Sequence, residues 1–196
     1  ILGYAQLMGE DASVPPHRQQ AVAVIKRGGE HLLSLIEGTL DLAHIEAGKL
    51  TLQPRPLRFG DMLQELGSMF ELQASEKGLR FAFEPGEGLP EWVRADEKRV
   101  RQILINLLGN AIKFTARGQV TLRVAYAREF ADIEIEDSGP GLQPDELAKI
   151  FEPFARAGSA AQAAPGAGLG LTIAKMLTDL MGGELQARST SGVGSV

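Results

Sequence analysis

The stretch Asn106-Leu-Leu-Gly-Asn110-Ala-Ile-Lys113-Phe114 ends an apolar helical pattern that begins after Asp96. Asn106, Asn110 and Lys113 follow one another at spacings of four and three residues, so they project from one face of a helix. Amide oxygens can bind Mg²⁺ and leave its charge to the phosphates of a nucleotide, and a lysine adds a positive charge for phosphate oxygens. Taken alone, the motif fits two solvated asparagines on an amphipathic helix equally well.

A second motif, Asp137-Ser-Gly139-Pro-Gly141-Leu, follows the alternating segment 133–136, where a strand is predicted to end. Glycines let the backbone approach a ligand closely. A carboxylate at this place can accept a hydrogen bond from an amino group such as that of adenine. In isolation, a Gly-Pro turn after a strand explains the motif better than a binding site does.

A third motif, Gly166-Ala-Gly168-Leu169-Gly170-Leu171, runs into a helix predicted over 170–181. A glycine-rich loop that opens a helix offers free N–H groups and the positive end of the helix dipole to phosphate. The motif is not a Walker loop, because no Gly-Lys-Ser/Thr follows it, and it does not follow a strand as the dinucleotide fingerprint requires.

Taken together and in this order, the three motifs resemble the N, G1 and G2 boxes of the sensor histidine kinases, hybrid members included. Phe151-Glu-Pro-Phe154 is similar to their F box. That family lies in the ATPase superfamily that also holds gyrase and the mismatch-repair ATPases. The resemblance covers nearly the whole chain. It implies ATP and Mg²⁺ as cofactors, transfer of the γ-phosphate to a histidine of the dimerisation domain, and relay to an aspartate of a response-regulator receiver domain.

The resemblance also implies a role for each residue of the motifs. Asp137 would accept from the adenine amino group, in a pocket shaped by Gly139 and Gly141, and Phe114 would pack beside the nucleotide. Asn110 would be the principal Mg²⁺ ligand, supported by Asn106. The residues expected to act on the phosphates are Asn106, Lys113 and Arg156 as catalytic side chains and Gly166, Gly168, Leu169 and Gly170 as the phosphate-binding loop. The small and polar segment 156–165 is expected to be a lid that becomes ordered on nucleotide binding.

The predicted fold has two parts, residues 1–52 and 53–196, which meet where Pro54 and Pro56 interrupt an alternating pattern. The first part has helical patterns over 1–10 and from Pro16 to near Gly48. By resemblance, it is the helical-hairpin remnant of a dimeric four-helix bundle. The second part mixes helices, predicted after Asp61, after Asp96 and over 170–181, with strands over 80–84, 120–124 and 133–136. We expect an α+β class and a two-layer α/β sandwich of the Bergerat type, with helices on one face of a mixed sheet whose last strand is truncated.

The composition of the 196-residue chain excludes several classes of function. There is no cysteine, so disulfides, thiol catalysis and cysteine metal sites are absent. A net charge of −5 is unsuited to a nonspecific nucleic-acid binder. No apolar run is long enough to span a membrane. A cytoplasmic location is therefore expected, and a membrane anchor elsewhere in a longer protein is left open.

Two other functions remain open beside the kinase. The first is a hydrolytic ATPase of the same superfamily, which needs a general base to activate water. In the hydrolytic relatives a glutamate occupies the position of Asn106, and an amide cannot accept the proton, so phosphoryl transfer is favoured. The second is a nucleotide-sensing or scaffold module without turnover.

The phosphate acceptor is the chief departure from the family pattern. None of the three histidines, His17, His31 and His44, lies in the acceptor context of a His-Glu/Asp followed by Arg/Lys-Thr-Pro. The opening segment 1–4 is similar to the stretch a little over two helical turns after the acceptor. We therefore expect a chain truncated before the acceptor, which binds Mg-ATP, does not autophosphorylate, and forms a weakened homodimer through its N-terminal helices.

Overall fold

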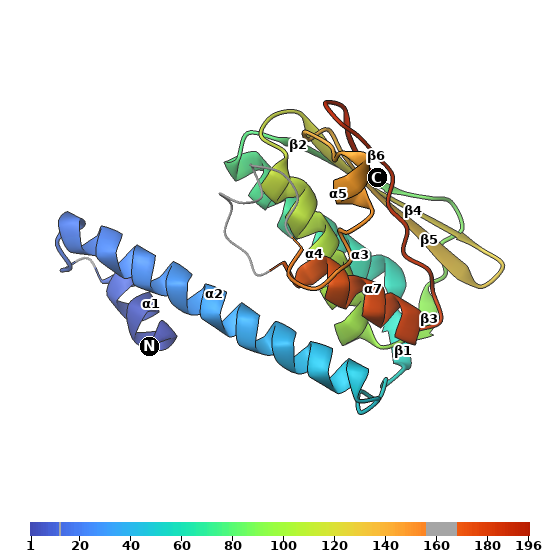
Figure 1. Cartoon of the computed structure of the whole chain (residues 1–196), viewed down its shortest axis with the longest axis horizontal. Helices are drawn as coiled ribbons and strands as arrows, with labels where there is room; N and C mark the ends of the chain where they lie inside the picture. Colours follow the sequence, from blue (N-terminus) through green and yellow to red (C-terminus); the bar gives the residue numbers. More distant parts are fainter. Residues whose placement is uncertain (12, 156–167) are drawn as a thin grey trace.

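The computed structural model describes residues 1–11, 13–155 and 168–196. Figure 1 shows a long helical arm lying beside a layered body. The arm consists of α1 (Leu2–Glu10) and α2 (Pro16–Glu46). The helices described in the body are α3 (Phe59–Glu76), α4 (Glu97–Phe114), α5 (Pro144–Leu147) and α7 (Gly170–Leu180). The strands are β1 (Arg55–Arg58), β2 (Arg80–Pro85), β3 (Trp92–Ala95), β4 (Gln119–Ala127), β5 (Phe130–Asp137), β6 (Ser189–Thr190) and β7 (Gly194–Ser195).

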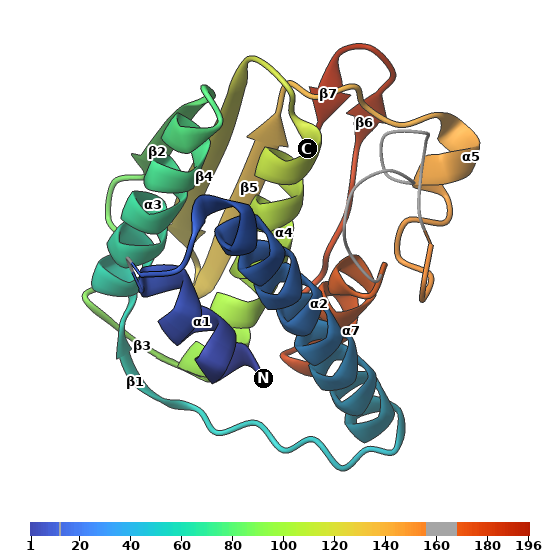
Figure 2. The same cartoon turned by 90° about the vertical axis from the view of Figure 1, so that its left-hand side faces the viewer.

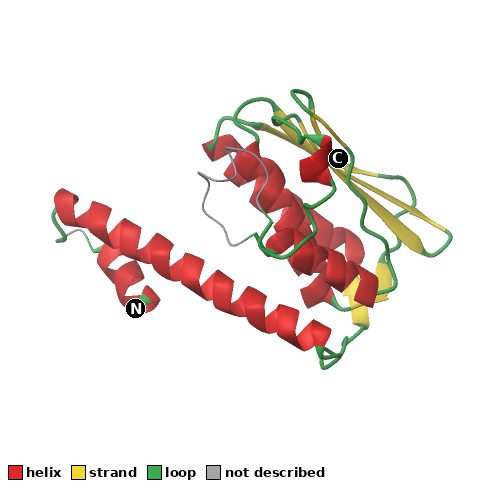
Figure 3. Ribbon diagram, viewed as in Figure 1, coloured by secondary structure: helices red, strands yellow, loops and turns green. Residues whose placement is uncertain are grey.

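Five strands form a mixed sheet in the order β2-β4-β5-β7-β6, and β1 pairs separately with β3. Within the larger sheet β2 and β4 are parallel, whereas the other pairs are antiparallel. In the hairpin between β4 and β5, Arg128 and Glu129 both adopt positive φ, which is the backbone of the tight turn that suits twisted strands. The helices of the body lie on one side of this sheet (Figure 3), so the expected α+β class with a mixed sheet is confirmed.

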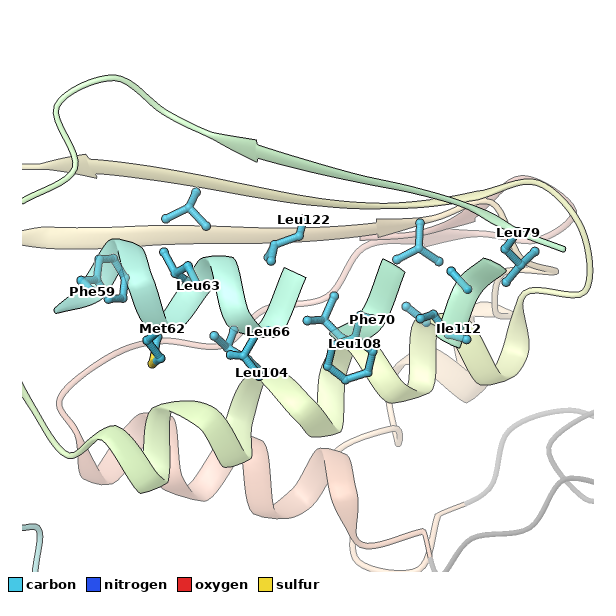
Figure 4. Packing of buried hydrophobic residues seen from close by; sticks show 14 of the residues in the cluster. Phe59, Met62, Leu63, Leu66, Phe70, Leu79, Leu104, Leu108, Ile112 and Leu122 are labelled. Carbon is cyan, nitrogen blue, oxygen red and sulfur yellow. The ribbon is translucent and has the colours of Figure 1, made fainter. Parts of the chain in front are cut away.

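The core lies between the larger sheet and the helices α3 and α4 (Figure 4). The two helices bury side chains at spacings of three and four residues, and β4 turns its alternate residues Val120, Leu122 and Val124 into this layer. The fully buried large side chains of this layer are Met62, Leu63, Phe70, Leu104, Leu108, Val120, Leu122 and Val124. Leu104 and Leu108 turn one face of α4 toward the core, so the helical period places Asn106 and Asn110 on the opposite face.

Several local predictions need correction. Helix α3 begins at Phe59 with Arg58 at its N-cap, which is before the start predicted after Asp61. Asp61 is a first-turn residue that pairs with Arg58 at 3.1 Å. Pro56 does not end the extended segment, because it lies in β1 of a two-stranded sheet, an edge position that tolerates proline. Its partner β3 was not predicted, because four residues are too few for a readable alternation.

The arm is docked on the body through α2. Gly38 lets α2 approach α7 closely, since a Cβ at Gly38 would lie 3.3 Å from the side chains of both Leu169 and Ile173. One turn further along α2, Asp41 accepts hydrogen bonds from Arg99 at 3.1 Å and from Gln102 at 2.7 Å. The side chains of Asp41 and Arg99 are 19% and 15% exposed, so this pair is largely withdrawn from water. The division at residue 52 into two domains stays a prediction.

Truncation of a core residue on α4 should destabilise the protein. Leu108 is 0% exposed, and Leu108→Ala leaves a cavity between α4 and the sheet, so we expect a loss of about 3 kcal/mol in the free energy of unfolding. Ile105 on the same helix is 42% exposed, and Ile105→Ala should cost less than about 1 kcal/mol. Urea unfolding of both variants measures the difference, and equal losses would contradict the assigned inner face of α4.

Candidate functional site

A cavity of about 1010 Å³ lies between α4, the end of β5 with its following loop, the first turn of α7, and the docked arm. The chain segments that border it are far apart in the sequence and side by side in Figures 1 and 2. Nine of the predicted site residues line this cavity: Asn106, Asn110, Lys113, Phe114, Asp137, Gly141, Gly168, Leu169 and Gly170. Three motifs that were separately ambiguous therefore form one site.

A second hollow, of about 700 Å³, lies at the N-terminal end of α4. Two of the arginines that line it, Arg99 and Arg101, already form ion pairs, with Asp41 at 3.1 Å and with Glu65 at 2.6 Å respectively. None of the predicted site residues that the structure describes lines it. The chemistry predicted from the sequence is therefore concentrated in the larger cavity.

Helix α4 provides the polar wall of the larger cavity. Asn106 and Asn110 lie one turn apart, and within the described part of the chain neither amide takes part in a hydrogen bond. Two amide oxygens fit a Mg²⁺ that keeps its water and phosphate ligands. The same residues, 1–11, 13–155 and 168–196, contain no cluster of three acidic or histidine side chains able to hold a metal alone. The Lys113 ammonium lies 4.6 Å from the centre of the Phe114 ring, so these two predicted residues also meet.

Asp137 lies at the end of β5, where its carboxylate accepts a hydrogen bond from the backbone N–H of Gly139 at 2.7 Å. Gly139 therefore acts on the site by orienting this carboxylate. Burial raises the pKa of Asp137 above its ordinary value, and hydrogen bonds from Gly139 and Ser195 act against that rise. A half-buried carboxylate that borders a cavity in this way is a typical ligand-binding group.

The Asp137 loop is fixed by close backbone contacts with the C-terminal hairpin. Gly141 has φ +62, and a Cβ at this position would collide with the carbonyl oxygen of Thr190. Gly194 has φ +144, and its Cβ would collide with the carbonyl oxygen of Asp137. Both positions therefore require glycine for space as well as for conformation. Ser195, which pairs with Asp137 in the sheet, was missed because the sequence indicates a last strand but not which strand it pairs with.

The glycine-rich loop meets the polar face of α4. A Cβ at Gly170 would lie 3.5 Å from the Asn106 side chain, so the first turn of α7 directly adjoins the predicted metal-binding face. Gly168 has φ +73, and its carbonyl accepts a hydrogen bond from the Phe154 N–H at 3.0 Å. Among the described residues, no side-chain hydrogen bond caps the start of α7, and the first backbone N–H groups of a helix have no partner within the helix, as anion binding requires.

Some predictions lie outside the described residues, and some contributors to the cavity were missed. Arg156, Gly166 and the expected lid over 156–165 all fall within 156–167, which the structure does not describe. Among the missed contributors are Glu37 and Gly38 of the arm, which also border the cavity. Their sequence context indicates only a long helix, so no local signal associates them with the three motifs.

Substitution of Gly141 tests the fixed geometry of the Asp137 loop. Gly48 has the same φ of +62 but no atom within 4 Å of its Cβ position. Gly48→Ala should therefore show only the cost of the left-handed backbone, about 1 kcal/mol. Gly141→Ala adds a collision with the Thr190 backbone, so its free energy of unfolding should fall by at least about 1 kcal/mol more. Urea unfolding measures the free energy of unfolding of both variants. Equal losses would show that the Asp137 loop can move to accommodate the Cβ without a loss of stability.

Comparison with known proteins places this geometry in a family. Residues 95–196 match the family described as histidine kinase-, DNA gyrase B-, and HSP90-like ATPase. The whole chain is 35% identical to the autoinducer 2 sensor kinase/phosphatase LuxQ of Vibrio parahaemolyticus and 36% identical to the aerobic respiration control sensor protein ArcB of Escherichia coli. It spans 23% and 25% of the lengths of those relatives.

Solved structures show the same relation. Full-length ShkA in complex with AMPPNP superposes with a TM-score of 0.81 at 34% identity, over all of this chain and 40% of ShkA. The catalytic domain of the histidine kinase ThkA superposes with a TM-score of 0.61 at 26% identity, over 73% of this chain and 92% of that domain. From its motifs, its cavity and these matches, the chain belongs to the histidine kinase-, DNA gyrase B- and HSP90-like ATPase family, among relatives that are sensor histidine kinases.

Proposed function

We propose that this chain is the ATP-binding catalytic region of a sensor histidine kinase. Its function is to bind Mg-ATP and transfer the γ-phosphate to a histidine of the dimerisation domain, for relay to an aspartate of a response-regulator receiver domain. One observation carries the proposal: Asp137, the amides of Asn106 and Asn110, and the first turn of α7 all border a single cavity. Such a cavity has one end suited to a nucleobase and another end suited to phosphates.

The adenine end is the wall around Asp137. Its carboxylate is oriented by the Gly139 N–H at 2.7 Å and can accept a further hydrogen bond from the adenine amino group. In a half-buried site such a charged hydrogen bond is stronger than it is in water. Guanine presents a carbonyl oxygen where adenine has its amino group, and the carboxylate would repel it. The site therefore favours ATP over GTP.

The phosphate end is the wall between α4 and α7. Free N–H groups and the helix dipole at Gly170 attract phosphate oxygens, and Lys113 adds a positive charge from α4. Asn106 and Asn110 would hold Mg²⁺, which when bound neutralises the phosphate charge and orients the γ-phosphate for transfer. A Cβ added at Gly170 would lie 3.5 Å from the Asn106 side chain. This short distance supports the division of roles, because the metal-binding wall and the phosphate-binding wall then lie next to each other.

The acceptor of the phosphate is more consistent with a protein side chain than with water. Asn106 is an amide that cannot take a proton from an attacking water molecule, so α4 does not supply the general base that hydrolysis needs. A histidine of a dimerisation domain brings its own nucleophile. Positioning and charge stabilisation, which this cavity offers, are then the main requirements for phosphoryl transfer.

The arm is proposed to pair with the arm of a second copy. Apolar side chains on α1 and α2 are exposed to solvent, among them Tyr4 at 77%, Leu7 at 65% and Leu32 at 58%. An apolar surface of this kind marks an interaction site. In a homodimer the two arms together would form the four-helix bundle that is expected of this family. No helix of the described residues is both long and apolar enough to cross a membrane.

Replacement of Asp137 should separate stability from binding. Its pKa is raised by burial, so its contribution to stability is present below the ordinary carboxyl pKa and is lost as the pH rises through the folded-state pKa. At pH 7 the ionised carboxylate thus costs stability, and Asp137→Asn should raise the unfolding midpoint. ATP binding should weaken about 10- to 100-fold, because a charged hydrogen bond is lost. Thermal unfolding and calorimetric titration measure both; unchanged ATP affinity would contradict the adenine assignment.

Incubation of the chain with Mg-ATP tests the type of reaction. His17, His31 and His44 lie outside the acceptor context, so the chain should bind Mg-ATP without forming acid-labile phosphohistidine. Addition of a dimerisation domain that carries the acceptor histidine should restore the phosphorylation of that histidine. Phosphohistidine on the chain alone would contradict this expectation, and rapid release of inorganic phosphate without an acceptor would favour the hydrolytic ATPase.

A further inference from the structure

The docked arm brings a carboxylate to the phosphate end of the cavity. Helices α2 and α4 run in opposite directions where they meet (Figures 1 and 2). Asp41 of α2 accepts a hydrogen bond from the Gln102 side chain of α4 at 2.7 Å. Four residues are about one helical turn, so one turn back along α2 and one turn forward along α4 place Glu37 opposite Asn106. Both residues line the cavity, which agrees with this placement.

Contacts of the neighbouring residue support the same position. A Cβ added at Gly38 would lie 3.3 Å from the Leu169 side chain. A Cβ added at Gly170, the next residue, would lie 3.5 Å from the Asn106 side chain. Glu37 is therefore next to a residue that touches the start of α7, where the phosphates are proposed to bind.

The carboxylate of Glu37 has no ion-pair partner among the residues that the structure describes. Its neighbour on the arm, Asp41, is by contrast neutralised by Arg99 at 3.1 Å. The described residues of the cavity wall include six acidic side chains, at Glu37, Asp132, Glu134, Asp137, Glu146 and Glu184, and two basic ones, at Lys113 and Arg188. The described part of the cavity wall thus carries a net negative charge, although its proposed ligand is an anion.

We propose that Glu37, positioned by the docked arm, makes the phosphate end selective for the metal-bound nucleotide. This inference rests on the proposed function. A carboxylate near the phosphates repels a metal-free triphosphate and attracts the divalent cation that a metal-bound triphosphate carries. The asparagines of α4 are neutral and cannot make this distinction by charge. Glu37 is therefore a residue of the arm that determines which form of ATP the catalytic body accepts.

The test is a ratio of dissociation constants for ATP: the Kd measured with EDTA divided by the Kd measured with Mg²⁺. Glu37→Gln should lower this ratio about three- to tenfold, as expected for the loss of one charge at a partly screened distance. Glu37→Lys should lower it further. Calorimetric titration measures the affinities without any need for turnover, and unfolding midpoints verify that each variant is folded.

Two controls isolate the position and the ligand. Glu46→Gln makes the same change of charge on the same helix, at an exposed residue outside the cavity wall, and should leave the ratio unchanged. AMP, which lacks the β- and γ-phosphates, should bind to the parent and to Glu37→Gln with equal affinity. An Asp41→Asn background weakens the docking of the arm, so the effect of Glu37→Gln should become smaller there.

The outcomes separate this inference from the proposed function. If the parent binds ATP and Glu37→Gln leaves the ratio at the parent value, the inference is overturned and the proposed function stands. An equal fall of the ratio in Glu46→Gln would also overturn it, because the effect would then be one of net charge. A folded parent that binds no ATP with or without Mg²⁺ would overturn the proposed function itself.

Discussion

The structure depends on the two faces of α4. One face must bury Leu104 and Leu108 against α3 and the sheet, while the other must present Asn106 and Asn110 to a cavity. The helical period satisfies both demands only if α4 keeps its rotation about its own axis. The N-cap helps to fix that rotation, since the Asp96 side chain accepts from the Arg99 N–H while its other oxygen accepts from the Gln53 N–H at 2.9 Å. The orientation of α4 therefore determines both the packing of the core and the shape of the cavity wall.

The second wall of the cavity is constrained by backbone contacts and not by side-chain packing. Asp137 ends β5, and glycines at 141 and 194 let the carbonyl groups of Thr190 and Asp137 approach closer than any Cβ would permit. This arrangement joins the C-terminal hairpin to the Asp137 loop, so that a carboxylate whose charge is disfavoured by burial is still held in one position. Burial of a charged carboxylate lowers the stability of the fold, and a neutral side chain would not have this cost. A carboxylate kept at such a place is typical of a binding site.

Predictions from the sequence succeeded where a physical signal is local. The face of Asn106, Asn110 and Lys113 follows from helical spacing, and the Asp96 start of α4 follows from capping chemistry. The class of the fold followed from the order of such segments. What failed or was missed depends on distant partners: β3 exists because β1 lies beside it, and Ser195 reaches Asp137 through the pairing of β7 with β5. The part that Glu37 and Gly38 take in the cavity depends on the docking of a helix that begins far away in the chain, and no window of sequence contains that information.

The docked arm makes the nucleotide site and the proposed dimerisation helices parts of one equilibrium. The arm is held by the approach of Gly38 to Leu169 and Ile173, by the hydrogen bonds of Asp41 with Arg99 and Gln102, and by Leu42 and Ile45, which pack against the cluster at the start of α7. Contacts between two parts of one chain can be shifted by a modest difference in free energy. Coupling between two events is reciprocal. If the docked arm makes the cavity prefer Mg-ATP over free ATP through Glu37, then Mg-ATP must favour the docked arm over the released arm by the same factor, relative to free ATP. A carboxylate on the arm would in this way make the position of the arm depend on the metal-bound state of the nucleotide.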